Sequence, residues 1–339
     1  MGLRIVSDLD EWHRWQRRRH VARSLKRRTV GSRGTDAHAT VVHGSPDADI
    51  VVLIDALHAS MANAVLAPLQ FIPPERVITV LAPGLELDMP GASRMVRIDD
   101  LGDHLTSARS LLGCGEYTGI GAAAWRWARA AGVATFVSQH GALTPLAPPL
   151  PRDSTLLAWS ASDGEFWRSG RSDVQHVVVG SQLLWAAAGS PDVAHRSDGA
   201  GRLTYLGQGH AAEISRRRLV EAALLLCREQ EAIYRPHPSE RDRLSLITHN
   251  AFRRAGVTVD AAGAPLADLD GPVVSVFSTG ILEAAVRGRD AWVDFPRPPA
   301  WLGEFWERYG MRRLGNLPTS PPDLPSEEPA RRVAAALCR

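Results

Sequence analysis

The sequence predicts an α/β protein with parallel sheets, and two observations support this class. Short apolar, β-branched runs of strand length alternate with segments of helical periodicity along most of the chain. Several of these runs end in a small polar or glycine-rich turn, where the helix that follows a parallel strand would begin. The clearest unit covers residues 271–295, with a strand at 272–277, a turn, a helix from 281 to 288 and a strand at 291–293.

Length and composition describe a globular chain of one large or two ordinary domains. The 339 residues are 45% hydrophobic and 22% charged, which is enough for a sizeable core. Three distant cysteines, Cys114, Cys227 and Cys338, predict neither a disulfide framework nor a zinc site. A net charge of +2 gives no reason to expect nucleic acid as a partner. We expect a cytoplasmic protein, because no apolar run approaches the roughly 20 residues of a membrane span and the N-terminus is charged.

The first 30 residues form a basic segment that we expect to be helical. Eight arginine and lysine side chains between positions 14 and 28 surround a thin apolar edge that includes Trp12 and Trp15. Such a helix can rest on an anionic surface, which would place the protein at the inner face of the membrane. The alternative is a solvated helix that packs through its few apolar residues. Both interpretations remain open.

Residues 31–195 predict a first α/β domain. Strands are expected at 49–55, 76–81, 93–98, 133–137, 155–160 and 176–179, and helices at 61–69, 101–112, 122–131 and from 163. Asp55 and His58 follow the first of these strands, and Gln139 and His140 follow the fourth. We therefore expect them at the carboxyl edge of the sheet, on the acceptor side of a binding site, although polar residues are common at strand ends.

Residues 196–325 predict a second α/β domain, and residues 326–339 a final helix that can cross back onto the first. Strands are expected at 202–206, 232–234, 257–259, 272–277 and 291–293, and helices at 213–231, 240–255, 281–288, 301–309 and 327–338. Arg235 and His237 follow the second of these strands. Ser278, Thr279 and Gly280 follow the fourth.

Two roles are open for the turn at 278–280. The free N–H groups and partial positive charge of a helix start attract an anion, and the two hydroxyls of this turn would add donors. Alternatively, one hydroxyl only caps the helix. Three loops thus carry polar side chains at strand carboxyl ends, namely 139–141, 235–238 and 278–283. Two domains facing each other would place these loops around one cleft, where a phosphate would gain charge-assisted bonds.

Three short motifs, taken in order, resemble known transferases. His237-Pro238 after a strand, with Ser278-Thr279 before a helix about 40 residues later, is similar to the HP and S-S/T elements of bacterial sialyltransferases. The pair is equally similar to the HP and T-D-Y-S-S elements of CDP-glycerol glycerophosphotransferases. SQHGALTPL at 138–146 resembles the Q-x-W-H-G-T-P-x-K element of the latter family and the Q-H-G element of capsule polysaccharide transferases.

The resemblance implies a GT-B-type transferase, with two Rossmann-like domains facing a central cleft and a cytidine nucleotide bound by the C-terminal domain. It implies contacts to the donor phosphate from His237, Ser278 and Thr279. His140 would be the general base, unless it is only a turn histidine. Glu283 stands where related enzymes hold the ribose hydroxyls, unless it is only an acid favoured in the first turn of a helix.

The sequence departs from these families at three points. Leu146-Ala147 replaces the lysine-bearing end of one motif, and Ser275-Val276-Phe277 replaces T-D-Y in the other. The acidic D/E-D-G base of sialyltransferases has no clear counterpart, and Asp163-Gly164-Glu165 is the candidate for it. No aspartate pair is placed to hold a metal, so we expect inverting, metal-independent transfer of a sugar or an alditol phosphate without a resident cofactor. His140 would take the proton of the acceptor hydroxyl, and Arg235, placed by its charge, would help to stabilise the leaving nucleotide.

Two other functions remain open. A UDP-sugar-dependent GT-B glycosyltransferase or 2-epimerase would use the same cleft with a different base pocket. A non-catalytic protein would instead bind a polyanion or a membrane surface through the basic N-terminus. For an enzyme, the expected partners are a nucleotide-sugar or CDP-alditol donor and a hydroxyl acceptor on a glycan or a small metabolite.

Overall fold

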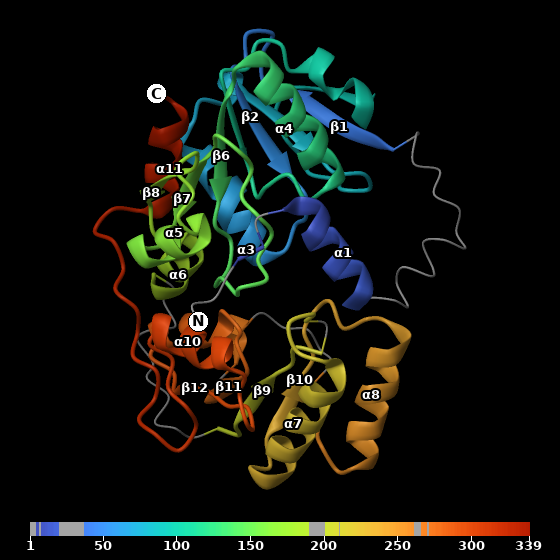
Figure 1. Cartoon of the computed structure of the whole chain (residues 1–339), viewed down its shortest axis with the longest axis vertical. Coiled ribbons are helices and arrows are strands. Elements are labelled where there is room, and N and C mark those ends of the chain that lie inside the picture. Colours follow the sequence, from blue (N-terminus) through green and yellow to red (C-terminus); the bar gives the residue numbers. More distant parts are fainter. Residues whose placement is uncertain are drawn as a thin grey trace. The chain divides into compact units, whose positions relative to one another are not determined.

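The chain forms two compact units, each built on its own sheet. The computed structural model describes residues 5–6, 8–19, 37–189, 201–209, 211–260, 266–269 and 271–339. One unit comprises Met1–Trp185 and Leu324–Arg339, and the other comprises Ala186–Asp323. Helices flank both sheets, so the predicted α/β class is confirmed (Figure 1). The boundary predicted at 195 lies outside the described residues, and the units divide after Trp185.

The first unit is built on an eight-stranded sheet in the order β4-β1-β3-β2-β5-β6-β7-β8. Neighbours from β3 to β8 are parallel, whereas β1 is antiparallel to β3 and β4. The strands are β1 (His38–His43), β2 (Ile50–Ile54), β3 (Val77–Leu81), β4 (Ala92–Arg97), β5 (Ser110–Gly113), β6 (Ala134–Ser138), β7 (Thr155–Ala158) and β8 (Gln175–Val178).

Helices cover both faces of this sheet. The α-helices are α1 (Leu9–Arg19), α3 (Ala59–Met61), α4 (Gly119–Ala131), α5 (Ala161–Arg168), α6 (Gln182–Ala188) and α11 (Pro329–Leu337). A π-helix (Ala62–Leu66) and a 3₁₀-helix (Ala67–Phe71) continue α3, and further 3₁₀ turns lie at Pro74–Arg76 and Ile98–His104. The final helix, α11, belongs to the first unit and packs on its sheet. Within the described ranges, no helix combines the length and apolar composition needed to cross a bilayer.

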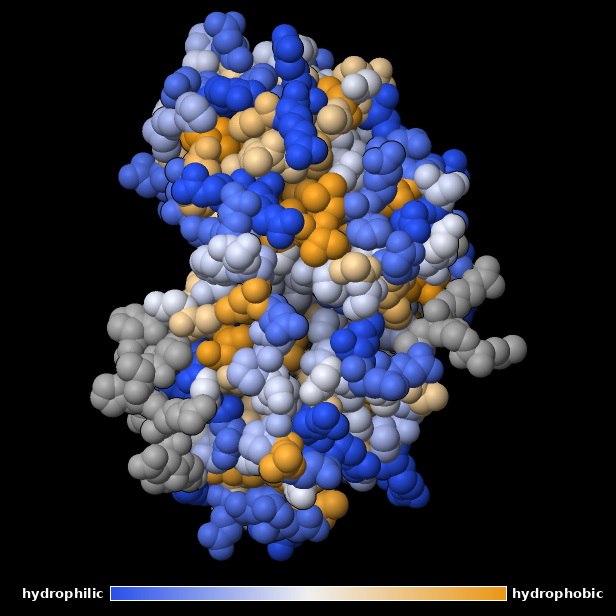
Figure 2. All heavy atoms as spheres, turned by 90° about the vertical axis from the view of Figure 1, so that its left-hand side faces the viewer, coloured by the Kyte–Doolittle hydropathy of each residue, from blue (hydrophilic) through white to orange (hydrophobic). Residues whose placement is uncertain are grey.

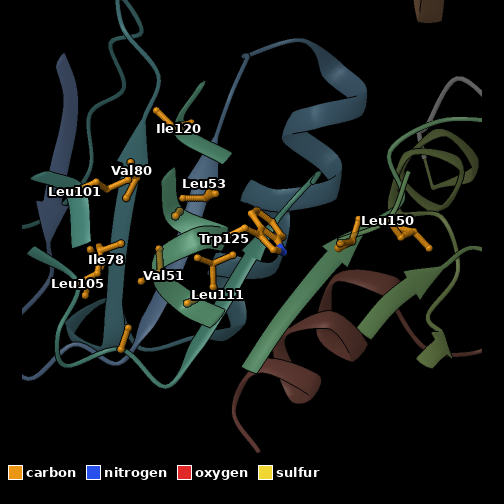
Figure 3. Close-up of a cluster of buried hydrophobic side chains, with 14 of the residues drawn as sticks. Val51, Leu53, Ile78, Val80, Leu101, Leu105, Leu111, Ile120, Trp125 and Leu150 are labelled. Carbon is orange, nitrogen blue, oxygen red and sulfur yellow. The ribbon is translucent and has the colours of Figure 1, made fainter. Parts of the chain in front are cut away.

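Strand β2 shows why the first sheet needs cover on both faces. All five of its residues are fully buried, and they alternate between two apolar clusters. Val51 and Leu53 join Trp125 of α4 in the cluster of Figure 3. Ile50 packs on the opposite face, which α11 covers with Leu337. Because each fully buried aliphatic side chain contributes about 1.5–3 kcal/mol, this strand fixes the centre of the unit.

The second unit is built on four parallel strands in the order β10-β9-β11-β12. The strands are β9 (Thr204–Leu206), β10 (Ile233–Arg235), β11 (Val273–Ser275) and β12 (Ala291–Val293). The helices are α7 (Arg216–Glu229), α8 (Arg243–Arg254), α9 (Gly280–Val286) and α10 (Ala300–Arg308), with a 3₁₀ turn at Leu266–Asp268. All carboxyl ends of these strands lie at one edge, because the strands are parallel.

Three expectations about local structure are wrong. The helix predicted at 101–112 is replaced by a 3₁₀ turn and by β5, whose four residues are all buried between β2 and β6. Burial between parallel partners here overrides the helical periodicity. The strand predicted at 257–259 is a single bridge from Val259 to Tyr234. Strand β1, which was not predicted, makes the first sheet mixed.

Candidate functional site

In the first unit, polar side chains follow adjacent parallel strands at one sheet edge. Strands β2, β5, β6 and β7 are neighbours, and Asp55, Cys114, Gln139 and Trp159 directly follow them. We call the region of Asp55, His58, Gln139 and His140 the first carboxyl edge. The structure thus brings together the residues that the sequence assigned to the acceptor side.

His140 is a neutral imidazole in this setting. Burial, and then the nearby positive charge of His58, lower the pKa of His140 to about 4, while the Ser138 carbonyl offsets part of that shift. Its Nδ1 is buried without a hydrogen-bond partner in the described part of the chain. A neutral imidazole can accept a proton near pH 7, although a pKa of about 4 makes it a weaker base than free imidazole.

His58 has its Nδ1 occupied by the start of α3. The Met61 backbone N–H donates to Nδ1 at 3.4 Å, and the Ser60 hydroxyl lies 3.0 Å from the same atom. Desolvation lowers the pKa of His58. In the neutral ring the proton therefore sits on Nε2, which leaves one donor directed away from the helix.

Asp55 has a buried carboxylate that receives no hydrogen bond from the described residues. Both of its oxygen atoms are buried and find no partner among the described residues. Burial raises the pKa of Asp55, and the Thr118 hydroxyl offsets part of the shift without reaching hydrogen-bond geometry. Thr118 instead uses its hydroxyl oxygen to accept from the Gly121 N–H at 3.0 Å, capping α4. Because buried polar groups are normally satisfied, the bare carboxylate favours an external hydrogen-bond donor.

Gln139 supports its neighbour His140. Its side chain accepts from the Trp159 N–H at 2.8 Å and donates to the Gly141 carbonyl and the Asp163 carboxylate, both at 3.1 Å. With the residue only 2% exposed, these bonds fix the loop that carries His140. They indicate a positioning role, and the predicted contact of Gln139 with an acceptor stays a prediction.

Helix α1 packs near this edge through its aromatic side. The Trp12 indole N–H donates to the Leu146 carbonyl at 2.8 Å, and its ring lies 5.7 Å from that of Tyr117. Trp12 is thereby buried, while Arg14 and Arg17 are exposed. The predicted basic residues beyond position 19 lie outside the described residues, and membrane contact through this segment stays a prediction.

In the second unit, the loops after β10 and β11 carry the predicted donor-binding residues, and the loop after β9 lies between them. Gln208 follows β9, Arg235 ends β10 with His237 two residues on, and Ser278 follows β11. We call this region the second carboxyl edge. Strand β9 lies between β10 and β11, so the three loops are neighbours.

Glu240 joins two of these loops to α8. Its carboxylate accepts from the backbone N–H groups of Gly209 at 2.9 Å and His237 at 3.3 Å, and from the Tyr234 hydroxyl at 2.8 Å. Nε2 of His249 lies 3.1 Å from the same carboxylate, whose side chain is 2% exposed. This saturated, buried carboxylate fixes the backbone on both sides of the Arg235–His237 loop.

Gln208 makes the corresponding link to β11. Its side-chain oxygen accepts from the Phe277 N–H at 2.8 Å and from the Ser275 hydroxyl at 3.1 Å. The loop that leads into Ser278 is therefore tied to the loop after β9. Together, Gln208 and Glu240 hold the second carboxyl edge in one arrangement.

The predicted phosphate-binding residues differ in how they are held. His237 Nδ1 accepts from the Ser239 N–H at 3.1 Å, which places the proton of a neutral ring on Nε2. The Ser278 hydroxyl oxygen accepts from the Gly280 N–H at 3.1 Å, as the capping alternative expects. Thr279 precedes α9 and makes no side-chain cap bond. A side chain at Gly280 would meet Leu206 at 2.9 Å, so this position needs a small residue.

The carboxylate of Glu283, on α9, lies near three arginine side chains. Burial raises its pKa, and Arg287, Arg235 and Arg289 each offset part of the rise. The Arg287 Nε lies 3.9 Å from the Glu283 carboxylate, and the two side chains are 11% and 18% exposed. At this distance the two side chains form an ion pair but no hydrogen bond.

Two hollows in the described surface lie away from both edges. One, of about 400 Å³, is lined by Phe136, Val177, Arg332 and their neighbours between β8 and α11. Figure 2 faces the side of the first unit that carries β8 and α11 and shows apolar surface, in orange, among polar side chains. The other, of about 380 Å³, is lined by Asp49, Arg76 and Arg109. Neither contains a predicted site residue.

The sequence reasoning missed Gln208, Glu240 and Arg287. Gln208 lies in a turn, and the sequence around Glu240 predicts only the start of a helix. The spacing of Arg287, four residues after Glu283, was the one available signal, because such pairs share a helix face. In the described chain, no three His, Cys, Asp or Glu side chains come together as a metal site.

Among known proteins, only solved structures show similarity to this chain, and they show it at the level of the fold. No family model matches the chain, and no curated protein matches it. The structure of Anabaena Alr3699/HepE in complex with UDP-glucose is similar at a TM-score of 0.50 and 13% identity, over 86% of this chain and 88% of that one.

Two further structures are similar at lower scores. They are the S. aureus MnaA-UDP co-structure (TM-score 0.49, 13% identity, 86% of this chain and 88% of that one) and the UDP-GlcNAc 2-epimerase from Methanocaldococcus jannaschii (0.46, 12%, 85% and 99%). The chain has a GT-B-like α/β fold, as predicted. The finer resemblance to CDP-glycerol glycerophosphotransferases, capsule transferases and sialyltransferases gains no support from these structures and stays a prediction.

Proposed function

We propose that the chain is an enzyme that binds a uridine diphosphate sugar at the second carboxyl edge. The observation that supports this most is the fixed arrangement of the loops after β9, β10 and β11, which carry Arg235, His237 and Ser278. A rigid edge with a cation and hydrogen-bond donors suits a phosphate, because preorganised donors need no rearrangement on binding. Uridine is preferred because the Anabaena protein of like fold is seen with UDP-glucose.

The roles at the second carboxyl edge follow from side-chain chemistry. Arg235 and the Nε2 proton of His237 would contact the diphosphate, with the Thr279 hydroxyl as a further donor. Glu283 would accept hydrogen bonds from the ribose hydroxyls, which would satisfy a carboxylate that burial leaves costly. Gly280 would keep the start of α9 close to Leu206.

The chemistry would lie with the first carboxyl edge. In a transferase, the acceptor oxygen would bond to the anomeric carbon of the sugar, with inversion, as the bond from that carbon to the diphosphate breaks. Neutral His140 would take the hydroxyl proton, and UDP would leave with the electron pair. Asp55 would accept a hydrogen bond from a hydroxyl of the acceptor, since its carboxylate has no partner in the described chain. A 2-epimerase is the other reaction open to such a site.

A cytidine nucleotide is the second candidate donor. It rests on the motifs at 138–146, 237–238 and 278–279, which resemble those of cytidine-dependent transferases. Transfer of an alditol phosphate from a CDP-alditol belongs to the same candidate. A CDP-alditol has the same diphosphate as a UDP-sugar, so the phosphate-binding roles above apply to both, but there the acceptor oxygen would bond to the distal phosphorus and CMP would leave. A CMP-sugar would offer one phosphate to the same groups.

Thermal unfolding with separate nucleotides tests the proposal. At about 100 times its Kd a ligand stabilises the folded state by about 2.7 kcal/mol, which raises Tm on the order of 5–10 °C in a domain of this size. We expect this shift with UDP and UDP-glucose. A shift with CMP or CDP alone would favour the cytidine donor. No shift with any of these nucleotides would reject both.

A further inference from the structure

Arg287 is a largely buried cation, and two of its nitrogen atoms have no acceptor among the described residues. Its side chain is 11% exposed, and both Nε and Nη1 are buried without an acceptor among the described residues. The nearest carboxylate, that of Glu283, lies 3.9 Å from Nε, beyond hydrogen-bond length. Guanidinium groups in protein interiors are normally paired and hydrogen-bonded, so the free donors of Arg287 indicate a missing anionic partner.

The surroundings of Arg287 favour an anion over a neutral ligand. Three guanidinium groups, those of Arg287, Arg235 and Arg289, lie close enough to the Glu283 carboxylate to lower its pKa. Arg289 is held by its own bond, in which Nη1 donates to the Leu266 carbonyl at 3.0 Å. Leu266 in turn lies 3.1 Å from the place a side chain at Gly280 would occupy, so these groups gather beside α9.

Arg287 also lies close to a residue with a proposed ligand contact. Glu283 lies four residues before it on α9, Arg287 caps the carboxyl end of that helix, and Glu283 would hold the ribose. In a nucleotide, the phosphates are attached directly to the ribose. Beside the ribose contact, Arg287 offers unpaired N–H donors at Nε and Nη1, and cationic N–H donors match the oxygen atoms of a phosphate.

We propose that Arg287 binds a phosphate oxygen of the nucleotide donor, with Glu283 beside it on the ribose. This inference rests on the proposed function, because it places a nucleotide at the second carboxyl edge. It adds a ligand-binding residue that the motifs do not contain. Loss of the guanidinium would weaken binding of the diphosphate and leave the nucleoside contact in place.

Isothermal titration calorimetry with UDP, uridine and pyrophosphate tests the inference on the full chain. For Arg287→Gln we expect UDP to bind about 10- to 100-fold more weakly than to the wild type, with uridine unchanged. Arg287→Lys keeps the charge and loses the planar guanidinium group, so its affinity for UDP should lie between those of the wild type and Arg287→Gln. Arg217→Gln is the control, because that side chain is 86% exposed on α7 of the same unit, and it should bind like the wild type.

Each outcome decides the inference. UDP binding to Arg287→Gln as tight as to the wild type would overturn it, and so would an equal loss for UDP and uridine. Should Arg287→Gln not fold, the ratio of UDP to uridine affinity in Arg287→Lys decides in the same way. If the wild type binds no nucleotide, the proposed function fails separately. In that case, pyrophosphate binding by the wild type that is lost in Arg287→Gln would still support an anion site at Arg287. If the wild type does not bind pyrophosphate either, the inference is overturned.

Discussion

The backbone N–H of Gly209 donates to the Glu240 carboxylate at 2.9 Å, which joins the loop after β9 to the loop after β10. His237 donates to the same oxygen atom, and the Tyr234 hydroxyl donates to the other. The predicted phosphate-binding loop therefore takes its shape from a carboxylate that is itself too buried to touch a ligand.

Glu240→Ala should destabilise the fold, because it leaves several buried donors unpaired. At about 1–3 kcal/mol for each unsatisfied group, we expect a loss of about 2–4 kcal/mol in the free energy of unfolding, measured by urea denaturation. The affinity for UDP should fall as well, since the loops lose their common acceptor. Glu221→Ala, at an exposed ion pair on α7, is the control and should change stability by less than about 0.5 kcal/mol. A stability loss no larger than that of the control would contradict the positioning role.

His140→Ala should separate turnover from nucleotide binding. Removing a general base typically lowers the rate about 10²- to 10⁴-fold, while a donor site in the other unit would be left intact. Steady-state kinetics and calorimetry with UDP measure the two effects. His38→Ala, at a half-buried position of β1 on the antiparallel side of the sheet, serves as control. Unchanged turnover in His140→Ala would remove His140 from the chemistry, and a protein without turnover under any donor would favour the non-catalytic alternative.

The pH dependence of kcat/KM should reflect the low pKa of His140. Burial and His58 place that pKa at about 4, so the proton-accepting form dominates at neutral pH. We expect kcat/KM to be flat from about pH 6 to 8 and to fall as pH approaches 4. Because the folded-state pKa lies below the unfolded value, protonation also favours unfolding, and the stability that neutral His140 contributes is lost progressively as pH falls from about 6.5 to 4. Rates must therefore be compared at pH values where the fold remains intact. If kcat/KM already falls near pH 6.5, the pKa of the catalytic histidine is not lowered, which would contradict this prediction.

Asp55→Asn should reduce activity without reducing stability. The carboxylate is buried and bare, and a neutral amide costs less to bury than a charge. At pH 8 we therefore expect the free energy of unfolding to stay equal or to rise. The KM for the acceptor should rise, because the amide is a weaker acceptor of hydrogen bonds from hydroxyls. If the variant unfolds more easily and keeps its KM, Asp55 has a purely structural role.

Much of the fold and part of the site could be predicted from local patterns. The run at 49–55 and the strand–turn–helix at 272–288 could be recognised because a buried parallel strand is continuously apolar. The edge position of His140 and His237 followed, since each comes directly after such a strand. By contrast, the sequence does not predict β5 as a strand, because its four buried residues are too few to show a period. Glu240 and Gln208 could not be identified, because their bonds join residues as far as 31 and 69 positions apart.

The most direct measurement is a crystal structure of the chain soaked with UDP. We predict nucleotide density at the second carboxyl edge, with the diphosphate within hydrogen-bond distance of Arg235, His237 and Arg287 and the ribose on Glu283. Density for UDP at the amino ends of these strands, or on the first unit alone, would contradict the account.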